Sequence, residues 1–439
     1  MSTRAGPAFE ERAADWLEPW EAQRRILEGC RPLPCERTPL RQALGRALAE
    51  DVYADVTLPP WDNAGMDGYA VRSEDVRGAS PATPVVLAVR STVRAGAAAQ
   101  GSVRSGEAVR IMTGAPLPEG ADSVVRVEDT DAEAEPGLVR ILRDRDAGAS
   151  VRPAGQDARP GDKVLEAGHA IGPGAIGALA AMGRSEVLVR RRPVVAILVT
   201  GDELRSTERY EDVRRGLGVP DTNGPMLAAA TSTAEAVPTL LGIATDDRVA
   251  LQAAVERASG ADALVTVGGA SMGEADLVKR VLDEMGLRLE FWRVRMRPGS
   301  PFSFGWLPRR GGEQAVFGLP GNPASAFVTF ELFVRPYLLR AAGHSRIHRR
   351  RIVGRAGEEM HGGNRTQFVR VRLEGVGPEV WARRTGPQGS GLVRGLAAAE
   401  GLAIVPTGSR IAAGDPVDVI VLDGGIADPI LTSPEGPPS

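Results

Sequence analysis

The sequence predicts a multidomain protein of the α/β and β classes, built around a central three-layer α/β domain with a parallel sheet. The chain has 439 residues, which at about 150 residues per domain corresponds to about three folding units. Residues 192–337 alternate short apolar runs with segments of helical period. The segments on either side carry short strand-like runs between glycine turns. We therefore also expect a helical linking domain, a small β-rich domain and a C-terminal β-barrel.

The strands of the α/β domain are predicted from apolar runs that read as buried on both faces. They are Pro193–Thr200, Val237–Ala244, Ala263–Val267 and Ala315–Leu319. The predicted helices are Pro225–Ala236, a helix that begins after Asp246 as its N-cap, Glu274–Met285 and Ala324–Arg340. Right-handed crossovers then place the loops that follow the strands at one edge of the sheet.

The remaining boundaries follow from composition and from two helical stretches, one of them Pro173–Met182. We expect a split linking domain at residues 1–50 and 148–190 and a β-rich domain at residues 51–147. The α/β domain should span residues 191–343 and the β-barrel domain residues 344–425, followed by a disordered tail at residues 426–439.

Charge and hydropathy exclude several classes of protein. The net charge is -3 and the pI about 6.0, so the chain lacks the global basic field that non-specific nucleic-acid binding uses. Its longest apolar runs are too short to span a bilayer, which needs about 18 or more residues. The N-terminus has no signal-peptide core, and the two cysteines cannot form a disulfide framework. We expect a soluble, cytoplasmic protein with no nucleic-acid or membrane partner.

Two glycine-containing loops follow strands of the α/β domain, Gly268–Gly273 and Leu319–Ser325. Glycines permit close backbone approach, and the N-terminus of a helix presents free N–H groups to an anion. In the second loop Asn322 suits the N-cap and Pro323 the first helical position. Either loop alone is also typical of a tight turn, but two at one sheet edge favour a phosphate site.

Acidic residues occur at the same edge: Asp202 and Glu203, then Asp246, then Asp276. Carboxylates would repel a phosphate unless a divalent cation lies between them, so Mg²⁺ is the inferred cofactor. Two alternatives remain open at this point. Asp246 could serve only as a helix cap, and Asp276 could be an exposed acid paired with Lys279.

Walker, dinucleotide, nucleophile-elbow and zinc motifs are absent from the sequence. The segment 59–72 instead places Trp61, Met66 and Tyr69 beside Asp62 and Asp67. Its Asp-Asn and Asp-Gly pairs are typical of turns. The aromatic side chains could also stack on a ring system whose polar edge the carboxylates recognise.

Seven motifs occur in an order and spacing that resemble a known family. They are PPWDNAGMDGYAVR, RIMTGAPLPEGADSVV, AGQDARPGD, GDEL, DTNGPML, GGASMGEAD and FGLPGNPASAF. The chain resembles the MoeA family, the molybdopterin molybdenumtransferases related to the E domain of gephyrin, from about residue 20 to 423.

The resemblance implies the last step of molybdenum cofactor biosynthesis. Adenylylated molybdopterin would be cleaved with the help of Mg²⁺, molybdate would enter the dithiolene, and AMP would leave. The α/β domain would be of the molybdopterin-binding type. The family is a homodimer with its cleft between the α/β domain of one subunit and the β-rich domain of the other. A molybdopterin adenylyltransferase is an implied partner.

The resemblance also assigns residues. It implies catalytic roles for Asp62, Glu203, Asp246 and Asp276, the last three as metal ligands. It implies substrate binding by Asp67, Thr113, Asp157, Gly269, Ser271, Gly273, Arg297, Ser300, Pro320, Gly321, Asn322 and Pro323. We expect the amides of Gly269–Gly273 and Gly321–Ala324 to hold the charged diester.

One departure from the family pattern concerns the molybdate pocket. The family usually reads M-K-P-G-K-P, whereas this chain reads Met296-Arg297-Pro298-Gly299-Ser300-Pro301. Arg297 keeps a cation, but Ser300 loses one. Either a neighbouring arginine substitutes, or the chain is a weakened paralogue. A gephyrin-like scaffold without turnover is the second functional hypothesis, and a pterin adenylyltransferase, which would lack the β-rich domains, is the third. The sequence leaves three questions open: whether molybdate or tungstate is preferred, whether Ser300 abolishes activity, and which apo-enzymes receive the product.

Overall fold

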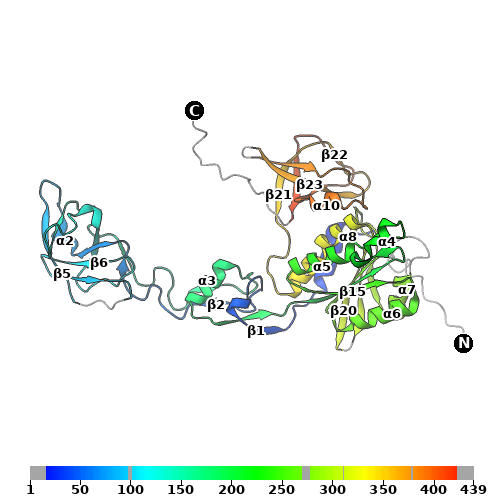
Figure 1. Ribbon diagram of the computed structural model, residues 1–439, viewed down its shortest axis with the longest axis horizontal. Helices are drawn as coiled ribbons and strands as arrows, with labels where there is room; N and C mark the ends of the chain where they lie inside the picture. The colour runs from blue at the N-terminus through cyan, green and yellow to red at the C-terminus, as the bar shows by residue number, and fades with distance from the viewer. Residues whose placement is uncertain (1–15, 97–100, 269–276, 310, 377–378, 423–439) are drawn as a thin grey trace. The chain divides into compact units, whose positions relative to one another are not determined.

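The computed structural model describes residues 16–96, 101–268, 277–309, 311–376 and 379–422 (Figure 1). Contacts divide the chain into two compact units. The first comprises residues 1–50, 167–173 and 186–439, and the second residues 51–166 and 174–185.

The first unit contains the α/β domain, a six-stranded sheet in the order β15-β12-β16-β20-β19-β17. Strands β12 (Val194–Thr200), β15 (Val237–Ala244), β16 (Ala263–Val267) and β20 (Gly312–Leu319) are parallel. They confirm the predicted parallel core. Strands β17 (Arg288–Phe291) and β19 (Ser303–Arg309), which the apolar pattern did not predict, run as an antiparallel edge.

Helices cover both faces of this sheet, which confirms three layers. Figure 1 shows α5 (Asn223–Thr233) and α8 (Pro323–Thr329) on one side, with α6 (Arg248–Arg257) and α7 (Leu277–Glu284) on the other. Each pair packs on its own apolar cluster because the buried strands present hydrophobic side chains to both faces.

The prediction that Asp246 caps α6 is wrong. The cap is Asp247, whose carboxylate accepts a hydrogen bond from the backbone N–H of Ala250. An N-cap side chain bonds the N–H of the second or third helical residue, and Ala250 is the third residue of α6. Asp246 is thereby free of the helix terminus.

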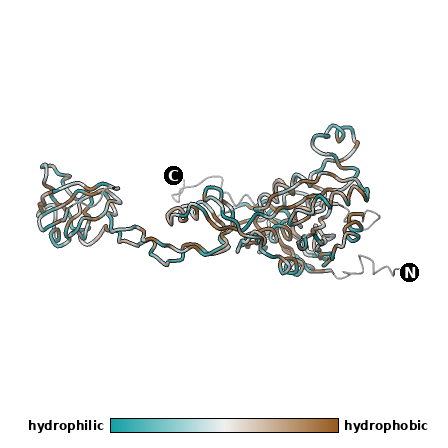
Figure 2. The backbone as a smooth tube through the Cα atoms, turned by 90° about the horizontal axis from the view of Figure 1, so that it is seen from below, coloured by the Kyte–Doolittle hydropathy of each residue, from teal (hydrophilic) through white to brown (hydrophobic). Residues whose placement is uncertain are grey.

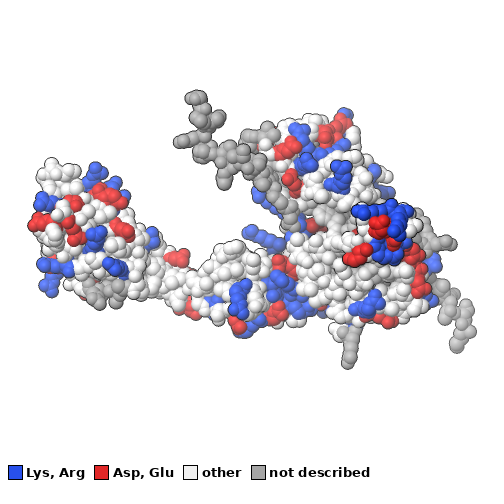
Figure 3. Space-filling model, viewed as in Figure 1, with Lys and Arg blue, Asp and Glu red and all other residues white. Residues whose placement is uncertain are grey.

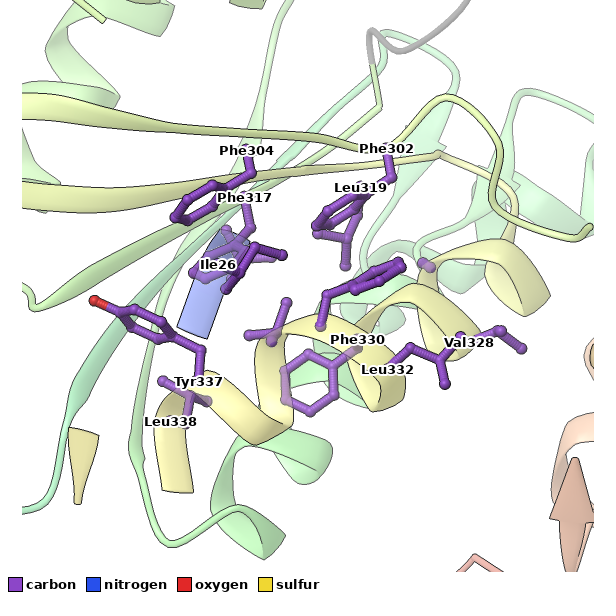
Figure 4. Close-up of a cluster of buried hydrophobic side chains, with 14 of the residues drawn as sticks. Ile26, Phe302, Phe304, Phe317, Leu319, Val328, Phe330, Leu332, Tyr337 and Leu338 are labelled. Atoms are coloured by element: carbon purple, nitrogen blue, oxygen red, sulfur yellow. The ribbon is translucent and has the colours of Figure 1, made fainter. Parts of the chain in front are cut away.

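The long helix predicted over 324–340 is interrupted. It consists of α8, a π-helical segment η5 (Phe330–Val334) and α9 (Arg335–Ala341). Pro323 takes the predicted first position, and Asn322 takes the N-cap position without a side-chain cap bond. In Figure 4 aromatic and aliphatic side chains from the sheet meet Phe330, Leu332 and Tyr337 of this helix, together with Ile26 of α1 (Pro19–Glu28).

The C-terminal region is a closed five-stranded barrel, as predicted. Its strands are β21 (Arg351–Ala356), β23 (Thr366–Val376), β24 (Glu379–Arg384), β25 (Gly401–Val405) and β27 (Pro416–Val421). The pairing of β23 with β25 closes the sheet around a separate apolar cluster. The short strand β18 (Met296–Arg297) pairs in parallel with the start of β23. Strand β1 (Cys35–Pro39), from the N-terminal part of the unit, pairs with β11 (Glu186–Arg190).

The second unit is mainly β. Its five-stranded sheet contains β4 (Gly68–Val71), β5 (Val85–Val93), β6 (Glu107–Ile111), β7 (Ser123–Arg126) and β8 (Leu138–Ile141). Two small ribbons pair β3 (Asn63–Ala64) with β9 (Val151–Arg152) and β2 (Val52–Tyr53) with β10 (Lys163–Leu165). Helix α3 (Pro173–Ala181) lies almost wholly in this unit.

Polar and apolar residues are distributed as expected for packed domains. Figure 2 shows hydrophobic stretches, in brown, recurring along the backbone of both units. Figure 3 shows acidic and basic side chains intermixed, most densely over α4 (Tyr210–Arg214), where Asp212 pairs with Arg209 and Glu211 with Arg214. Among the described residues, no helix is both long and apolar enough to cross a membrane.

Candidate active site

A cavity of about 750 Å³ lies in the first unit, beyond the carboxyl ends of the parallel strands. It collects six of the predicted site residues: Glu203, Asp246, Pro320, Gly321, Asn322 and Pro323. Thr200, at the end of β12, and Gly268, after β16, also line it. These residues come from four separate segments, which meet because parallel strands end at one edge of the sheet.

Glu203 is positioned by the turn after β12. Gly201 has a φ of +146°, and a Cβ atom there would lie 2.8 Å from Oε2 of Glu203. A side chain at position 201 would therefore displace this carboxylate. The backbone carbonyl of Glu203 is fixed by the N–H of Val219 at 2.8 Å. The turn thus directs an exposed carboxylate into the cavity.

Asp246 lies beside two other acids. Its backbone N–H donates to Oδ1 of Asp202 at 3.1 Å. Partial burial raises the pKa of the Asp246 carboxyl, and the negative charges of Asp202 and Glu203 raise it further. The three carboxylates therefore repel one another in the absence of a cation.

Gly268, the first residue of the predicted Gly268–Gly273 loop, lies very close to β12. Gly268 has a φ of +105°, and a Cβ atom there would lie 2.6 Å from the carbonyl oxygen of Thr200. A Cβ atom on Gly321 would lie 3.5 Å from the Cα atom of Gly268. The two loops predicted to hold an anion are thus neighbours. Gly269, Ser271, Gly273 and Asp276 lie outside the described residues.

The amides of residues 321–324 are only partly available to a ligand. Pro323 has no N–H group, and the N–H of Ala324 donates to the carbonyl of Ser390 at 2.9 Å. Ser390 belongs to a loop of the C-terminal barrel domain that also places Gly391 and Val393 on the cavity wall. Sequence reasoning missed this loop, because no motif links it to the α/β domain.

Asn223, in the DTNGPML segment, is another residue that sequence reasoning did not assign. Its Nδ2 donates to the carbonyl of Gly321 at 2.7 Å, and it lines the cavity. Its Oδ1 is buried and has no partner among the described residues. A buried acceptor of this kind is costly unless a ligand or water satisfies it. The signal that could have identified Asn223 from the sequence is its position in the DTNGPML motif.

Ser300 is buried and does have an arginine beside it. Its Oγ donates to the carbonyl of Val294 at 2.8 Å and accepts from Nη1 of Arg365 at 3.1 Å. The Arg365 guanidinium also lies 4.8 Å from the centroid of the Trp16 ring. Pro301 lines the cavity, whereas Arg297 is exposed at the end of β18.

The second unit holds the other four predicted residues. Oδ1 of Asp67 accepts from both the N–H and the hydroxyl of Thr113 at 2.7 Å. These hydrogen bonds lower the pKa of Asp67. Asp62 accepts from the N–H of Ala154 at 2.7 Å. Asp157 lines a cavity of about 540 Å³ together with Arg152.

The predicted aromatic surface in the second unit is partly wrong. Trp61 is 49% exposed, but Tyr69 is fully buried in the sheet and its hydroxyl donates to Glu133 at 3.1 Å. All four residues of β4 are buried, and Tyr69 packs in one of the two apolar clusters that this strand separates. Trp61 therefore remains the exposed aromatic side chain for stacking in this segment.

Chemically, the described arrangement offers hard oxygen donors, the carboxylates of Glu203 and Asp246, beside a cavity whose walls carry apolar side chains as well as polar groups. Oxygen donors of this kind suit Mg²⁺. Within the described ranges, no group of three or more His, Cys, Asp or Glu side chains is arranged to hold a metal ion.

Three segments match known families. Residues 17–183 match the MoeA N-terminal region (domain I and II), residues 196–340 a probable molybdopterin binding domain, and residues 354–422 the MoeA C-terminal region (domain IV).

Two curated relatives are similar over almost the whole chain. Molybdopterin molybdenumtransferase 2 of Mycobacterium tuberculosis (strain H37Rv) is 37% identical over 404 residues, covering 90% of this chain and 96% of the relative. Molybdopterin molybdenumtransferase of Staphylococcus aureus (strain COL) is 32% identical over 414 residues, covering 93% and 96%.

Among solved structures, a molybdopterin biosynthesis moeA protein from Pyrococcus horikoshii OT3 has a TM-score of 0.80 at 28% identity, covering 93% of this chain and all of that one. A second moeA protein structure from Pyrococcus has a TM-score of 0.73 at 32% identity, covering 93% and 99%.

Proposed function

Because this chain belongs to the MoeA family, we propose that it is a molybdopterin molybdenumtransferase that performs the last step of molybdenum cofactor biosynthesis. The substrate is adenylylated molybdopterin, and the reaction inserts molybdate and releases AMP. The observation that carries this proposal is the single cavity that joins Glu203 and Asp246 to the Pro320–Pro323 segment. A polyanionic substrate needs both features, a glycine-lined approach and a means of neutralising charge.

Mg²⁺ is the proposed cofactor. Glu203 and Asp246 would hold it together with Asp276, and their oxygen donors fit its preference. When bound, Mg²⁺ would neutralise phosphate charge and the mutual repulsion of these acids. The grouping of Asp246 with Asp202 and Glu203 at the cavity supports a cation at this place, because it would neutralise their negative charges.

The chain's own polar groups would orient the substrate. The unpartnered Oδ1 of Asn223 is an acceptor for a ligand N–H or hydroxyl, and its Nδ2 holds the carbonyl of Gly321. The amides of Gly321 and Asn322 remain to donate to phosphate oxygens, since Ala324 is already bonded. Glycine at 268 and 321 keeps the two loops close enough to act together.

Molybdate is proposed to bind near Ser300. The guanidinium of Arg365 contacts its hydroxyl, and this cation would replace the charge of the lysine that the chain lacks. Guanidinium donors suit tetrahedral oxyanions because they can bond two oxygens at once. This contact favours the enzyme over the scaffold hypothesis.

The second unit would complete the cleft from the other subunit of a homodimer. In this proposal residues 191–343 form the catalytic domain and residues 51–147 supply Asp62, Asp67 and Thr113, with Asp157 from the linking segment. A molybdopterin adenylyltransferase would provide the substrate in the cytoplasm.

The test incubates purified protein with adenylylated molybdopterin, Mg²⁺ and molybdate, and follows AMP and the formed cofactor by chromatography. We expect both products, and neither when Mg²⁺ is removed with EDTA. Asp276→Ala should abolish AMP release from a folded protein. Binding of the substrate without either product would support the scaffold instead.

The dimer is tested by mixing two inactive variants, Asp246→Ala and Asp67→Ala, after dissociation and reassembly. A cleft shared between subunits predicts that activity returns in the mixed dimers. If the mixture stays inactive although mixed dimers form, each cleft is built within one subunit.

A further inference from the structure

Arg370 of β23 is almost completely buried, with 1% of its surface exposed. In the described chain its guanidinium meets only neutral oxygens. Nη2 donates to the carbonyls of Pro387 at 3.2 Å and Gly389 at 3.1 Å, and Nη1 to that of Leu392 at 3.2 Å. Burial accordingly lowers its pKa.

The loop that receives these bonds, residues 386–393, joins β24 to α10 (Arg394–Ala397). Its Gln388 side chain completes the attachment, because Oε1 accepts from the backbone N–H of Arg370 at 2.9 Å and Nε2 donates to its carbonyl at 3.1 Å. Arg370 and Gln388 thus hold one loop through both side chain and backbone.

The far side of this loop faces the cavity. Gly391 and Val393 line it, and the Ser390 carbonyl accepts from the N–H of Ala324. A Cβ atom on Gly391 would lie 3.7 Å from Oδ1 of Asn322. The loop therefore both forms cavity wall and occupies an amide at the start of α8.

An apolar residue at position 370 would cost the barrel less than a buried charge does. The guanidinium reaches the three carbonyls from two separate nitrogens, Nη1 and Nη2, whereas a lysine would have to reach all of them from its single nitrogen. We propose that Arg370 is a positioning residue that holds the 386–393 loop as a wall of the cavity and so sets substrate affinity. The proposal deepens the proposed function and rests on it for the identity of the substrate.

The test compares Arg370→Lys with Arg372→Lys, an exposed arginine two residues along the same strand. We expect faster hydrogen exchange over residues 386–393 in Arg370→Lys only. The KM for adenylylated molybdopterin should rise about tenfold, which corresponds to one lost hydrogen-bonded contact, while kcat changes little. A purely structural role would instead lower the amount of folded enzyme and leave KM unchanged.

Gln388→Ala weakens the same attachment from the loop side, at a half-buried position. It provides a second test of the attachment if Arg370→Lys does not fold. Gln388→Ala should raise the KM for adenylylated molybdopterin and the rate of hydrogen exchange over residues 386–393. In the double variant of Arg370→Lys and Gln388→Ala, the increase in KM should be smaller than the two single effects combined. The proposal is overturned if both folded variants keep wild-type KM and exchange. If the wild-type protein releases no AMP, the proposed function fails, while the exchange comparison still decides whether Arg370 holds the loop.

Discussion

The hydroxyl of Ser300 accepts a hydrogen bond from the guanidinium of Arg365 at 3.1 Å. Position 300 is where the M-K-P-G-K-P pattern would place its second lysine, and Arg365 lies on a different domain, at the start of β23. The contact thus places a cation from another segment beside position 300.

The first prediction concerns this cation. Arg365→Gln should raise the KM for molybdate about tenfold or more, because one charge-assisted contact contributes roughly 1.5–3 kcal/mol. Arg365→Lys should retain part of the affinity, since it keeps charge without the fork. The assay is AMP release against molybdate concentration. An unchanged KM in Arg365→Gln would place the oxyanion elsewhere.

The second prediction separates two adjacent acids. Asp246→Ala should abolish AMP release without lowering stability, because this side chain lines the cavity. Asp247→Ala should leave activity near wild type and lower stability by about 1 kcal/mol, because it removes the N-cap bond to Ala250. Urea unfolding and AMP release on both variants check this. If a fully folded Asp247→Ala protein lost activity, Asp247 would have a role in the reaction beyond capping α6.

The third prediction contrasts two glycines that face each other. Gly268→Ala forces a Cβ atom to 2.6 Å from the Thr200 carbonyl at a φ of +105°. It should cost roughly 2 kcal/mol or more in the free energy of unfolding. Gly321→Ala makes only ordinary contact at 3.5 Å, so its fold should survive. Thermal unfolding of the two variants measures the difference, and equal midpoints would contradict it.

Regular parts of the fold were predictable from sequence, because local pattern dictates them. The strand Val237–Ala244 matches the structure residue for residue, and β12 matches within one residue. Strand β19 was missed because Gly305 and Pro308 interrupt its apolar pattern and its place depends on pairing with β20. Asp246 was misread because it and Asp247 are equally good caps by residue type.

The site was predictable where motifs follow strands, and Glu203 and Asp246 do share a cavity with the Pro320–Pro323 segment. The contributions of Arg365, Ser390 and Arg370 could not be predicted. Each acts through a contact between segments far apart in the chain, and composition offered no signal, since 51 of the 53 basic residues are arginine.

The last prediction concerns acid stability of the second unit. Asp146 is 4% exposed, and its two oxygens accept from Nε and Nη2 of Arg126, both at 2.8 Å. These bonds lower the pKa of Asp146 below its ordinary 3.8. A carboxyl whose folded pKa is lowered stabilises the fold above its unfolded pKa, and this contribution is lost as pH falls through the folded value.

Asp146→Asn should therefore lower the free energy of unfolding by about 1 kcal/mol at pH 7, because the partly exposed Arg126 loses its nearer carboxylate and keeps only Asp129, at 3.7 Å. The difference from wild type should shrink as the pH falls below about 4, because the carboxyl of the unfolded wild-type chain then takes up a proton before the folded one does. Urea unfolding of the full chain at pH 7 and pH 3 tests this, with the exposed Asp55→Asn as control. A difference that stays constant between the two pH values would mean that Asp146 acts through packing and hydrogen-bond geometry, and that its charge contributes nothing.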